Sequence, residues 1–229
     1  MILFSPHPSM KITFLAQSGF LIQTTTKTIG IDIWLSNPVK PLTHADIPKL
    51  DYSCCTHDHG DHGFETMMEL ARRDDALFLS GYEMMKHAHA QGCRTEQASV
   101  GGLFRVDDDL ELALVPAFHT SDTGQAIGFI FCIEGKTIYH MGDTAFMSEF
   151  GMIRDVYRPD IVMIPIGGRY TMGPREAGYA LDILQPTVAI PMHYNTFPKI
   201  IQHIDDLRKG MKTNMTNIVE LHPGETYGV

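Results

Sequence analysis

Short runs of β-branched and aromatic residues alternate with turn residues along the first part of the chain. "KITFLA", "FLIQTT" and "TIGIDIW" predict three consecutive strands between residues 11 and 34. "DYSCCT" predicts a fourth strand, which leads directly to His57. "HGFETMMELARRDD" then predicts a helix, because its apolar residues recur three or four positions apart. "YEMMKHAHAQG" predicts a second helix that ends at Gly92.

The second part of the chain repeats this progression from strands to helices. "LFRV" and "LELALVP" predict strands, and "AIGFIFCI" with "KTIYHM" predicts a hairpin around Glu134-Gly135. "DIVMIPI", "TVAIPM" and "NIVELH" predict three further strands. Helices are expected in "FMSEFGMIRDVYR", "GPREAGYALDILQ" and "FPKIIQHIDDLRKG". The chain therefore has an α/β pattern in which each half begins with strands.

An internal echo supports two related halves. "GFLIQTTTKTIGID" starts at Gly19 and "GFIFCIEGKTIYHMGD" starts at Gly128. Each has Gly-Phe, an apolar run, and then Lys-Thr-Ile beginning eight positions after the glycine. Strands followed by helices in both halves predict two sheets packed face to face, with helices on the outside.

Composition and charge limit the classes of binding partner and indicate the cellular compartment. The 229 residues suffice for one large domain or two small ones. The formal net charge of -9 argues against nucleic acid and against an anionic membrane surface as partners. None of the four cysteines forms a C-x-x-C pair, so buried reduced thiols are expected. The chain shows neither a signal peptide nor a membrane span, and the expected location is the cytoplasm.

The densest group of candidate metal ligands lies in "CCTHDHGDHGF". In an extended segment, residues two positions apart point to the same side. His57 and His59 therefore face one point, and Asp58 faces away. A glycine then permits a bend, after which Asp61 and His62 face a second point. The segment predicts two adjacent metal ions, each with one pair of ligands.

Two ligands leave each ion unsaturated, because zinc binds about four. Three expected strand ends offer more ligands: His119 in "VPAFHTSD", Asp143 in "IYHMGDT" and His193 in "AIPMHYN". The loops at strand ends are where open α/β folds place their sites. Asp143 has two carboxylate oxygens and could bridge both ions. Each of these residues alone would more often be a surface or core residue, so the prediction depends on the cluster. His140 is ambiguous, because it lies three residues before Asp143.

The motif "THDHGDH" resembles the H-x-H-x-D-H signature of the metallo-β-lactamase superfamily. The later His, Asp and His arrive in the order that this superfamily uses. The resemblance implies a four-layer αββα sandwich with two pseudo-symmetric halves. It also implies one metal held by His57, His59 and His119, a second held by Asp61, His62 and His193, and Asp143 as the bridge.

Longer stretches resemble one branch, the bacterial metal-dependent hydrolases related to L-ascorbate-6-phosphate lactonase. These stretches are "AQSGFLI", "GKTIYHMGDT", "PIGGRYTMGPREA" and "IPMHYNTFP". The resemblance covers nearly the whole chain from Met10. We therefore expect a single hydrolase domain over residues 10–229, with residues 1–9 either a dispensable N-terminal extension or the product of a misplaced start codon.

Four residues outside the ligand set are candidates for contacts around the site. The branch often has His where this chain has Gln17, and Arg169 stands where a smaller or neutral polar residue is expected. Both could line the pocket. Arg169 and Tyr194 are candidates for contact with an oxyanion or an anionic group. Asp58 is expected to hydrogen-bond a ligand histidine or the backbone and so to orient the ligands.

These observations together predict a metal-dependent hydrolase of a small molecule, with Asp61, Asp143 and His193 as catalytic residues. Two divalent ions, zinc first and manganese, iron or nickel otherwise, would share a hydroxide that attacks a lactone, another ester or a phosphodiester. One alternative is a metal-binding ligand sensor without turnover, against which the complete ligand set argues. Another is a di-iron redox protein, which in this superfamily usually carries a flavin domain. No feature of the sequence predicts the oligomeric state.

Overall fold

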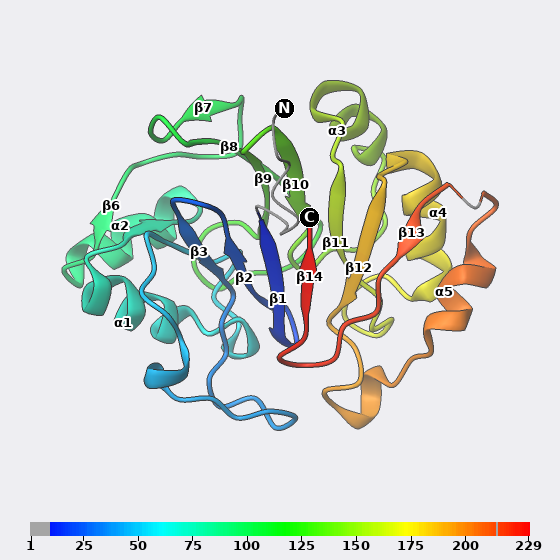
Figure 1. Cartoon of the computed structure of the whole chain (residues 1–229), viewed down its shortest axis with the longest axis horizontal. Coiled ribbons are helices and arrows are strands. Elements are labelled where there is room, and N and C mark those ends of the chain that lie inside the picture. The colour runs from blue at the N-terminus through cyan, green and yellow to red at the C-terminus, as the bar shows by residue number, and fades with distance from the viewer. Residues whose placement is uncertain (1–9, 214) are drawn as a thin grey trace, which may run out of the picture.

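The computed structural model describes residues 10–213 and 215–229, and the expected extension over residues 1–9 lies outside them. Two seven-stranded sheets lie side by side in the middle of the molecule (Figure 1). Helices α1 and α2 cover the outer face of one sheet, and α3, α4 and α5 cover the outer face of the other (Figure 1). The expected α/β fold, a four-layer αββα sandwich, is confirmed.

The first sheet has the strand order β14-β1-β2-β3-β4-β5-β6. Its strands come from the N-terminal half of the chain, except β14, which comes from the C-terminus. Their bounds are β1 Lys11–Ala16, β2 Gly19–Gln23, β3 Thr28–Ile31, β4 Tyr52–Cys54, β5 Leu77–Leu79, β6 Arg94–Thr95 and β14 Thr226–Gly228. Helices α1 (Phe64–Asp74) and α2 (Tyr82–Ala90) follow β4 and β5. Both helices turn an apolar stripe toward the sheet.

The second sheet has the order β13-β12-β11-β10-β9-β8-β7. Its strands are β7 Phe104–Arg105, β8 Leu110–Pro116, β9 Ile127–Ile133, β10 Lys136–His140, β11 Ile161–Pro165, β12 Val188–Met192 and β13 Asn217–Ile218. Helices α3 (Phe150–Tyr157), α4 (Pro174–Leu184) and α5 (Ile204–Gly210) cover it. The predicted hairpin is confirmed: β9 and β10 pair around Glu134 and Gly135, both with positive φ.

The two halves are pseudo-symmetric in their strand pairing. From β14 to β6, three antiparallel pairings are followed by three parallel ones. From β7 to β13 the same succession recurs. The repeated Gly-Phe and Lys-Thr-Ile segments occupy equivalent strands, β2 with β3 in one half and β9 with β10 in the other. The echo in the sequence thus marks a repeated arrangement of strands.

Three clusters of buried side chains hold the four layers together. The central cluster contains residues of both sheets, among them Phe20 and Phe129, and forms the interface between the sheets. A second cluster joins the second sheet to its helices through residues such as Phe150 and Leu181. A third joins the first sheet to α1 and α2 through residues such as Met67 and Phe78. Burial of these apolar surfaces is the main stabilising contribution to the stacking of the layers.

Two predicted elements were wrong in extent. The helix expected over residues 197–210 is divided into a short 3₁₀ turn, η3 (Pro198–Ile200), and α5. Between them Gln202 donates a side-chain hydrogen bond to the carbonyl of Gly167, and its backbone N–H donates to Asn195. These tertiary bonds replace the helical ones. The strand expected over residues 217–222 pairs only through its first two residues, and β5, β6 and β14 were not predicted.

The expectation of buried reduced thiols is confirmed for three cysteines, whereas Cys132 is half-buried. All four cysteines are free, and Cys54, Cys55 and Cys93 are buried. Burial raises the pKa of the Cys54 and Cys55 thiols, so both thiols are protonated. Among the described residues, no helix has the length and apolar character needed to cross a membrane.

Candidate metal centre

The candidate ligands gather at one end of the sandwich, where strands of both sheets terminate. In the first sheet β1, β3 and β4 run parallel to one another, and Gln17, Asp32 and His57 follow their carboxyl ends. In the second sheet β8, β10 and β12 run parallel, and His119, Asp143 and His193 follow theirs. The two sheets therefore contribute equivalent edges to one site.

Three histidines form the first group of converging ligand atoms. His57 Nε2 lies 3.0 Å from His59 Nδ1, and His119 Nε2 lies 3.3 Å from the same nitrogen. Ligand atoms of these residues all lie within 4.8 Å of one another, a spacing that could hold a metal ion. Two of these histidines come from the loop after β4, and the third comes from the other sheet, so the ion would join the two halves.

Asp61, His62 and His193 form the second group, with ligand atoms also within 4.8 Å of one another. His193 Nε2 lies 3.4 Å from Asp61 Oδ2. His62 is fully buried at the end of a 3₁₀ turn, η2 (Gly60–His62), directly before α1. His193 has φ 55°, a conformation that is rare for residues other than glycine and that indicates a locally strained backbone.

Asp143 lies between the two groups. Its Oδ2 is 3.0 Å from His193 Nε2 and 3.6 Å from His119 Nε2, while its Oδ1 is 3.3 Å from His62 Nε2. Gly142 makes this placement feasible: its φ is 61°, and a Cβ there would lie 2.5 Å from the carbonyl oxygen of Ile127. The carboxylate therefore faces ligands of both groups from a turn that requires glycine.

Unsatisfied polar atoms indicate that the site fits metal. His62 Nε2 and Asp143 Oδ1 are buried, face one another at 3.3 Å, and have no hydrogen-bond partner among the described residues. Buried polar groups are normally hydrogen-bonded, because leaving one unpaired costs roughly 1–3 kcal/mol. A cation bound between the two atoms would satisfy both. The donor set of imidazole nitrogens and carboxylate oxygens suits zinc, iron or nickel.

The pKa values of the histidines in these groups also indicate a site that fits a cation. Burial, with the nearby His62, lowers the pKa of His57 to about 2. Burial alone would lower the pKa of His193 too, but Asp143 outweighs it and raises that pKa to about 9. Burial is likewise outweighed at His62, whose pKa Asp143 and Asp32 raise well above its usual value. The raised pKa values of His62 and His193 show that the carboxylates around them favour a positive charge at this position, which a bound metal ion would supply.

Asp32 is a functional residue that the sequence reasoning missed. It is fully buried after β3, and its Oδ2 accepts a hydrogen bond from His62 Nδ1 at 2.8 Å. Its two oxygens also accept from the backbone N–H and the hydroxyl of Thr56. Such a carboxylate fixes the ring and tautomer of a ligand histidine. The available signal was an acidic residue inside the apolar run "TIGIDIW".

His140 acts on the turn that carries Asp143. Its ring is fully buried, and Nε2 donates to the carbonyl of Ser18 at 2.9 Å. Its Nδ1 accepts from the backbone N–H of Gly142 at 3.2 Å. Burial lowers the pKa of His140, and the neutral imidazole is the form that both bonds require. His140 therefore supports the turn, and backbone groups occupy both of its ring nitrogens.

Gln17 contacts ligands of the second group. Its Nε2 donates to Asp61 Oδ2 at 2.7 Å, and its backbone carbonyl accepts from the N–H of His193 at 2.7 Å. The side chain is 1% exposed. Ala16 and Gln17 have φ of 97° and 56°, so a strained turn at the end of β1 holds this residue in place. Gln17 therefore contacts Asp61 and His193 of the second group directly.

Asp58 faces away from the ligand groups, as the alternation predicts. Its Oδ1 accepts from the hydroxyl of Ser121 at 2.9 Å and from the backbone N–H of Asp122 at 2.8 Å. Burial would raise the pKa of Asp58, but bonds from residues 121–123 lower it below its usual value. The carboxylate thus joins the loop of His57 and His59 to the loop of His119.

Arg169 and Tyr194 do not reach the ligand groups. Arg169 is exposed and is not among the described residues that line the cleft. Tyr194 is 9% exposed and belongs to the buried cluster beneath the second sheet's helices. Burial raises its pKa, so its hydroxyl stays protonated. Neither residue lines the cleft over the ligand groups, and contact of either with an oxyanion or anionic group stays a prediction.

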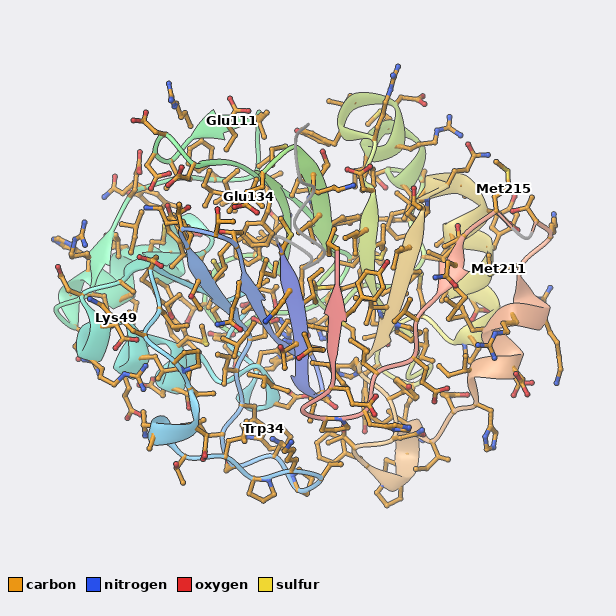
Figure 2. The ribbon with its side chains drawn as sticks, in the orientation of Figure 1. Trp34, Lys49, Glu111, Glu134, Met211 and Met215 are labelled. Atoms are coloured by element: carbon orange, nitrogen blue, oxygen red, sulfur yellow. The ribbon has the colours of Figure 1, made fainter. Side chains whose placement is uncertain are left out.

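A cleft of about 880 Å³ opens over the ligands. Its lining combines ligand residues with aromatic and polar side chains: Trp34, His59, Gly60, Asp61, His119, Thr120, Asp143, Tyr170, His193, Phe197, Pro198 and Lys199. Trp34 lies at the edge of the molecule below the ends of β1 and β14 in the view of Figure 2. A cleft of this size is typical of sites for small molecules.

Comparison with known proteins agrees with the geometry. Residues 11–193 match the family model described as "Beta-lactamase superfamily domain". A "UPF0173 metal-dependent hydrolase" of Staphylothermus marinus is 39% identical over 224 residues, covering 94% of this chain and 97% of that protein. One of Korarchaeum cryptofilum is 35% identical over 221 residues, covering 95% and 99%. The solved structure of Igni18, "a novel metallo hydrolase" from Ignicoccus hospitalis, has a TM-score of 0.88 at 35% identity and covers 95% of this chain and 97% of its own.

Proposed function

This chain belongs to the β-lactamase superfamily and, within it, to the UPF0173 metal-dependent hydrolases, and from that premise we propose that it cleaves a lactone, another ester or a phosphodiester at a site for two divalent ions. Zinc is the first candidate for both ions, with manganese, iron or nickel as alternatives. When bound, such ions lower the pKa of a shared water toward ~7 and polarise the bond to be cleaved.

Each side chain of the two ligand groups has a proposed role. His57, His59 and His119 would hold one ion, and Asp61, His62 and His193 would hold the second. Asp143 would contact both, because its two oxygens face His62 on one side and His119 and His193 on the other. Asp32 and Gln17 would keep His62 and Asp61 in place through the hydrogen bonds described above.

The observation that carries this proposal is the unpaired, buried face between His62 Nε2 and Asp143 Oδ1. A buried histidine and carboxylate that served only a structural role would normally form a hydrogen bond with each other or with a neighbour. The two atoms instead face each other at 3.3 Å, at ion-pair distance but without a hydrogen bond, between two groups of converging nitrogen and carboxylate oxygen atoms.

The bond class follows from the branch that the sequence resembles, that of L-ascorbate-6-phosphate lactonase. We propose a small molecule as substrate, because a cleft of about 880 Å³ and a net charge of -9 suit a small molecule better than a nucleic acid. We propose the cytoplasm as the compartment, since the four cysteines are free thiols.

Elemental analysis of fully loaded protein tests the number of ions. Wild type should bind two ions per chain, and His193→Ala should lose mainly the second. The control His203→Ala should lose neither, because His203 lies before α5, outside the ligand groups. Binding of at most one ion by wild type would contradict the two-ion site.

A turnover screen of metal-loaded protein tests the reaction. Lactones, thioesters, phosphodiesters and a chromogenic β-lactam cover the bond classes that this chemistry reaches. Hydrolysis of a lactone or ester that His57→Ala abolishes would support the proposal. Tight metal binding without turnover of any of these classes would favour a ligand sensor, and a visible absorption band from bound iron would favour redox chemistry.

A further inference from the structure

Three aromatic side chains, Trp34, Tyr170 and Phe197, line the cleft beyond the ligands. Trp34 follows β3 and is half-buried, and Tyr170 follows β11 with half of its side chain exposed. Phe197 comes from the loop after β12, and Pro198 is the first residue of η3. The rings of Trp34 and Phe197 lie 5.8 Å apart between centroids and are inclined by 39°, so they meet across the two halves. Flat apolar groups gain from contact with such rings.

One cation accompanies these rings. Lys199 in η3 is the single Lys or Arg among the described residues that line the cleft. It forms no ion pair with any described residue, whereas Lys27 and Lys209 each face carboxylates. The carboxylates of the lining, Asp61 and Asp143, face histidines of the ligand groups. Lys199 is therefore free to bind a group that enters the cleft.

We propose that the substrate of this site joins a flat apolar or aromatic part to an anionic group, a carboxylate or a phosphate. The inference rests on the hydrolytic function proposed above and names its substrate class. The apolar part would lie against Trp34 and Phe197, and Lys199 would bind the anion as a compact positive charge. On a chain with a net charge of -9, this lysine gives the cleft a local attraction for anions that the rest of the surface opposes.

Trp34 provides a direct readout, because it is the one tryptophan of the chain and lines the cleft. Its fluorescence can follow the binding of three matched probes to metal-loaded protein: 4-phenylbutyrate, 4-phenylbutylphosphonate and the neutral 4-phenyl-1-butanol. None of the probes contains a bond of the proposed hydrolysable classes. The measurement therefore does not depend on turnover, and its failure can be told from a failure of the proposed reaction.

The variants Lys199→Gln and Lys199→Arg distinguish the contribution of the lysine to anion binding from that of the metal ions. In wild type the two anionic probes should bind roughly threefold to tenfold more tightly than the alcohol, as suits an exposed charge pair beside apolar walls. Lys199→Gln should remove this preference and Lys199→Arg should keep it. Lys86→Gln, on the exposed side of α2, is the matched control and should behave as wild type. The relative affinities of the carboxylate and the phosphonate then show which anion the site favours.

Three results would contradict the proposal. If the preference for anions persists in Lys199→Gln, the metal ions alone bind the anion and the lysine is a surface charge. If wild type shows no preference for the anionic probes, the substrate class is wrong. Phe197→Ala should weaken all three probes by a similar factor, and unchanged affinity for the alcohol in that variant would contradict the role of the aromatic wall.

Discussion

Asp32 Oδ2 and His62 Nδ1 lie 2.8 Å apart, and both side chains are fully buried. The bond leaves His62 Nε2 pointed at Asp143, the direction in which it would bind metal. Asp32 accepts three hydrogen bonds in all, two of them from Thr56. One buried carboxylate thus fixes a ligand and the start of the ligand loop together.

Asp32→Asn should therefore weaken the second metal site. An amide has only one acceptor oxygen, so a donor of Thr56 or His62 would face an NH₂ group and stay unpaired. We expect affinity for the second ion to fall by ~10–100-fold, while the first ion stays bound. Titration with zinc against a competing chelator measures this. Asp205→Asn, on the exposed face of α5, should leave both affinities unchanged. Equal loss of both ions in Asp32→Asn would mean that the residue supports the whole fold instead.

Metal binding should release protons. Asp143 raises the pKa of His193 to about 9, and Asp143 with Asp32 raises the pKa of His62 well above its usual value. Both rings must lose a proton to bind metal. Metal affinity should therefore increase as the pH rises toward about 9. Calorimetry in buffers of different ionisation enthalpy counts the protons released at pH 7. His193→Gln should reduce that count, whereas a count of zero in wild type would show that the metal-free histidines are neutral.

The cluster at residues 57–62 and the three strand-end ligands could be predicted from the sequence, because ligand types and strand periodicity are local properties. Asp32 could not, since its contact with His62 depends on the parallel pairing of β3 with β4. β14 is similar: its three residues are a strand only because they pair with β1 at the other end of the chain. The break between η3 and α5 depends on Gln202 reaching Gly167. Each miss is a tertiary contact that no window of sequence contains.

Gln17 tests whether a residue of the first sheet supports the second metal site. It donates to Asp61 Oδ2 and is 1% exposed. Gln17→Ala should leave Asp61 free to rotate, and we expect roughly tenfold weaker binding of the second ion. Gln17→His tests whether the residue common in the related branch can replace it. Gln91→Ala, on the exposed end of α2, is the control. Unchanged metal affinity in Gln17→Ala would show that Asp61 binds the ion without help from Gln17.

The strongest test of the two-ion site concerns Asp143. Its oxygens face His62 at 3.3 Å and His193 at 3.0 Å from a turn that only Gly142 permits. Asp143→Asn keeps the shape of the side chain but removes its negative charge and one acceptor oxygen. Metal affinity should fall, and turnover at saturating metal should fall further, because both ions lose the ligand that they share.

Asp58→Asn is the matched comparison for Asp143→Asn. Asp58 holds the His119 loop through Ser121 and Asp122 and does not touch the ligand atoms, so its loss should cost ~10–100-fold at most. In wild type, kcat/KM should rise with pH through a single limb at roughly 6–8, without a separate protein base. Turnover of one substrate should be fastest in wild type, slower in Asp58→Asn and slowest in Asp143→Asn. This order tests whether Asp143 is shared by the two ions. Hydrolysis by Asp143→Asn at the wild-type rate would mean that this carboxylate does not join the two ions.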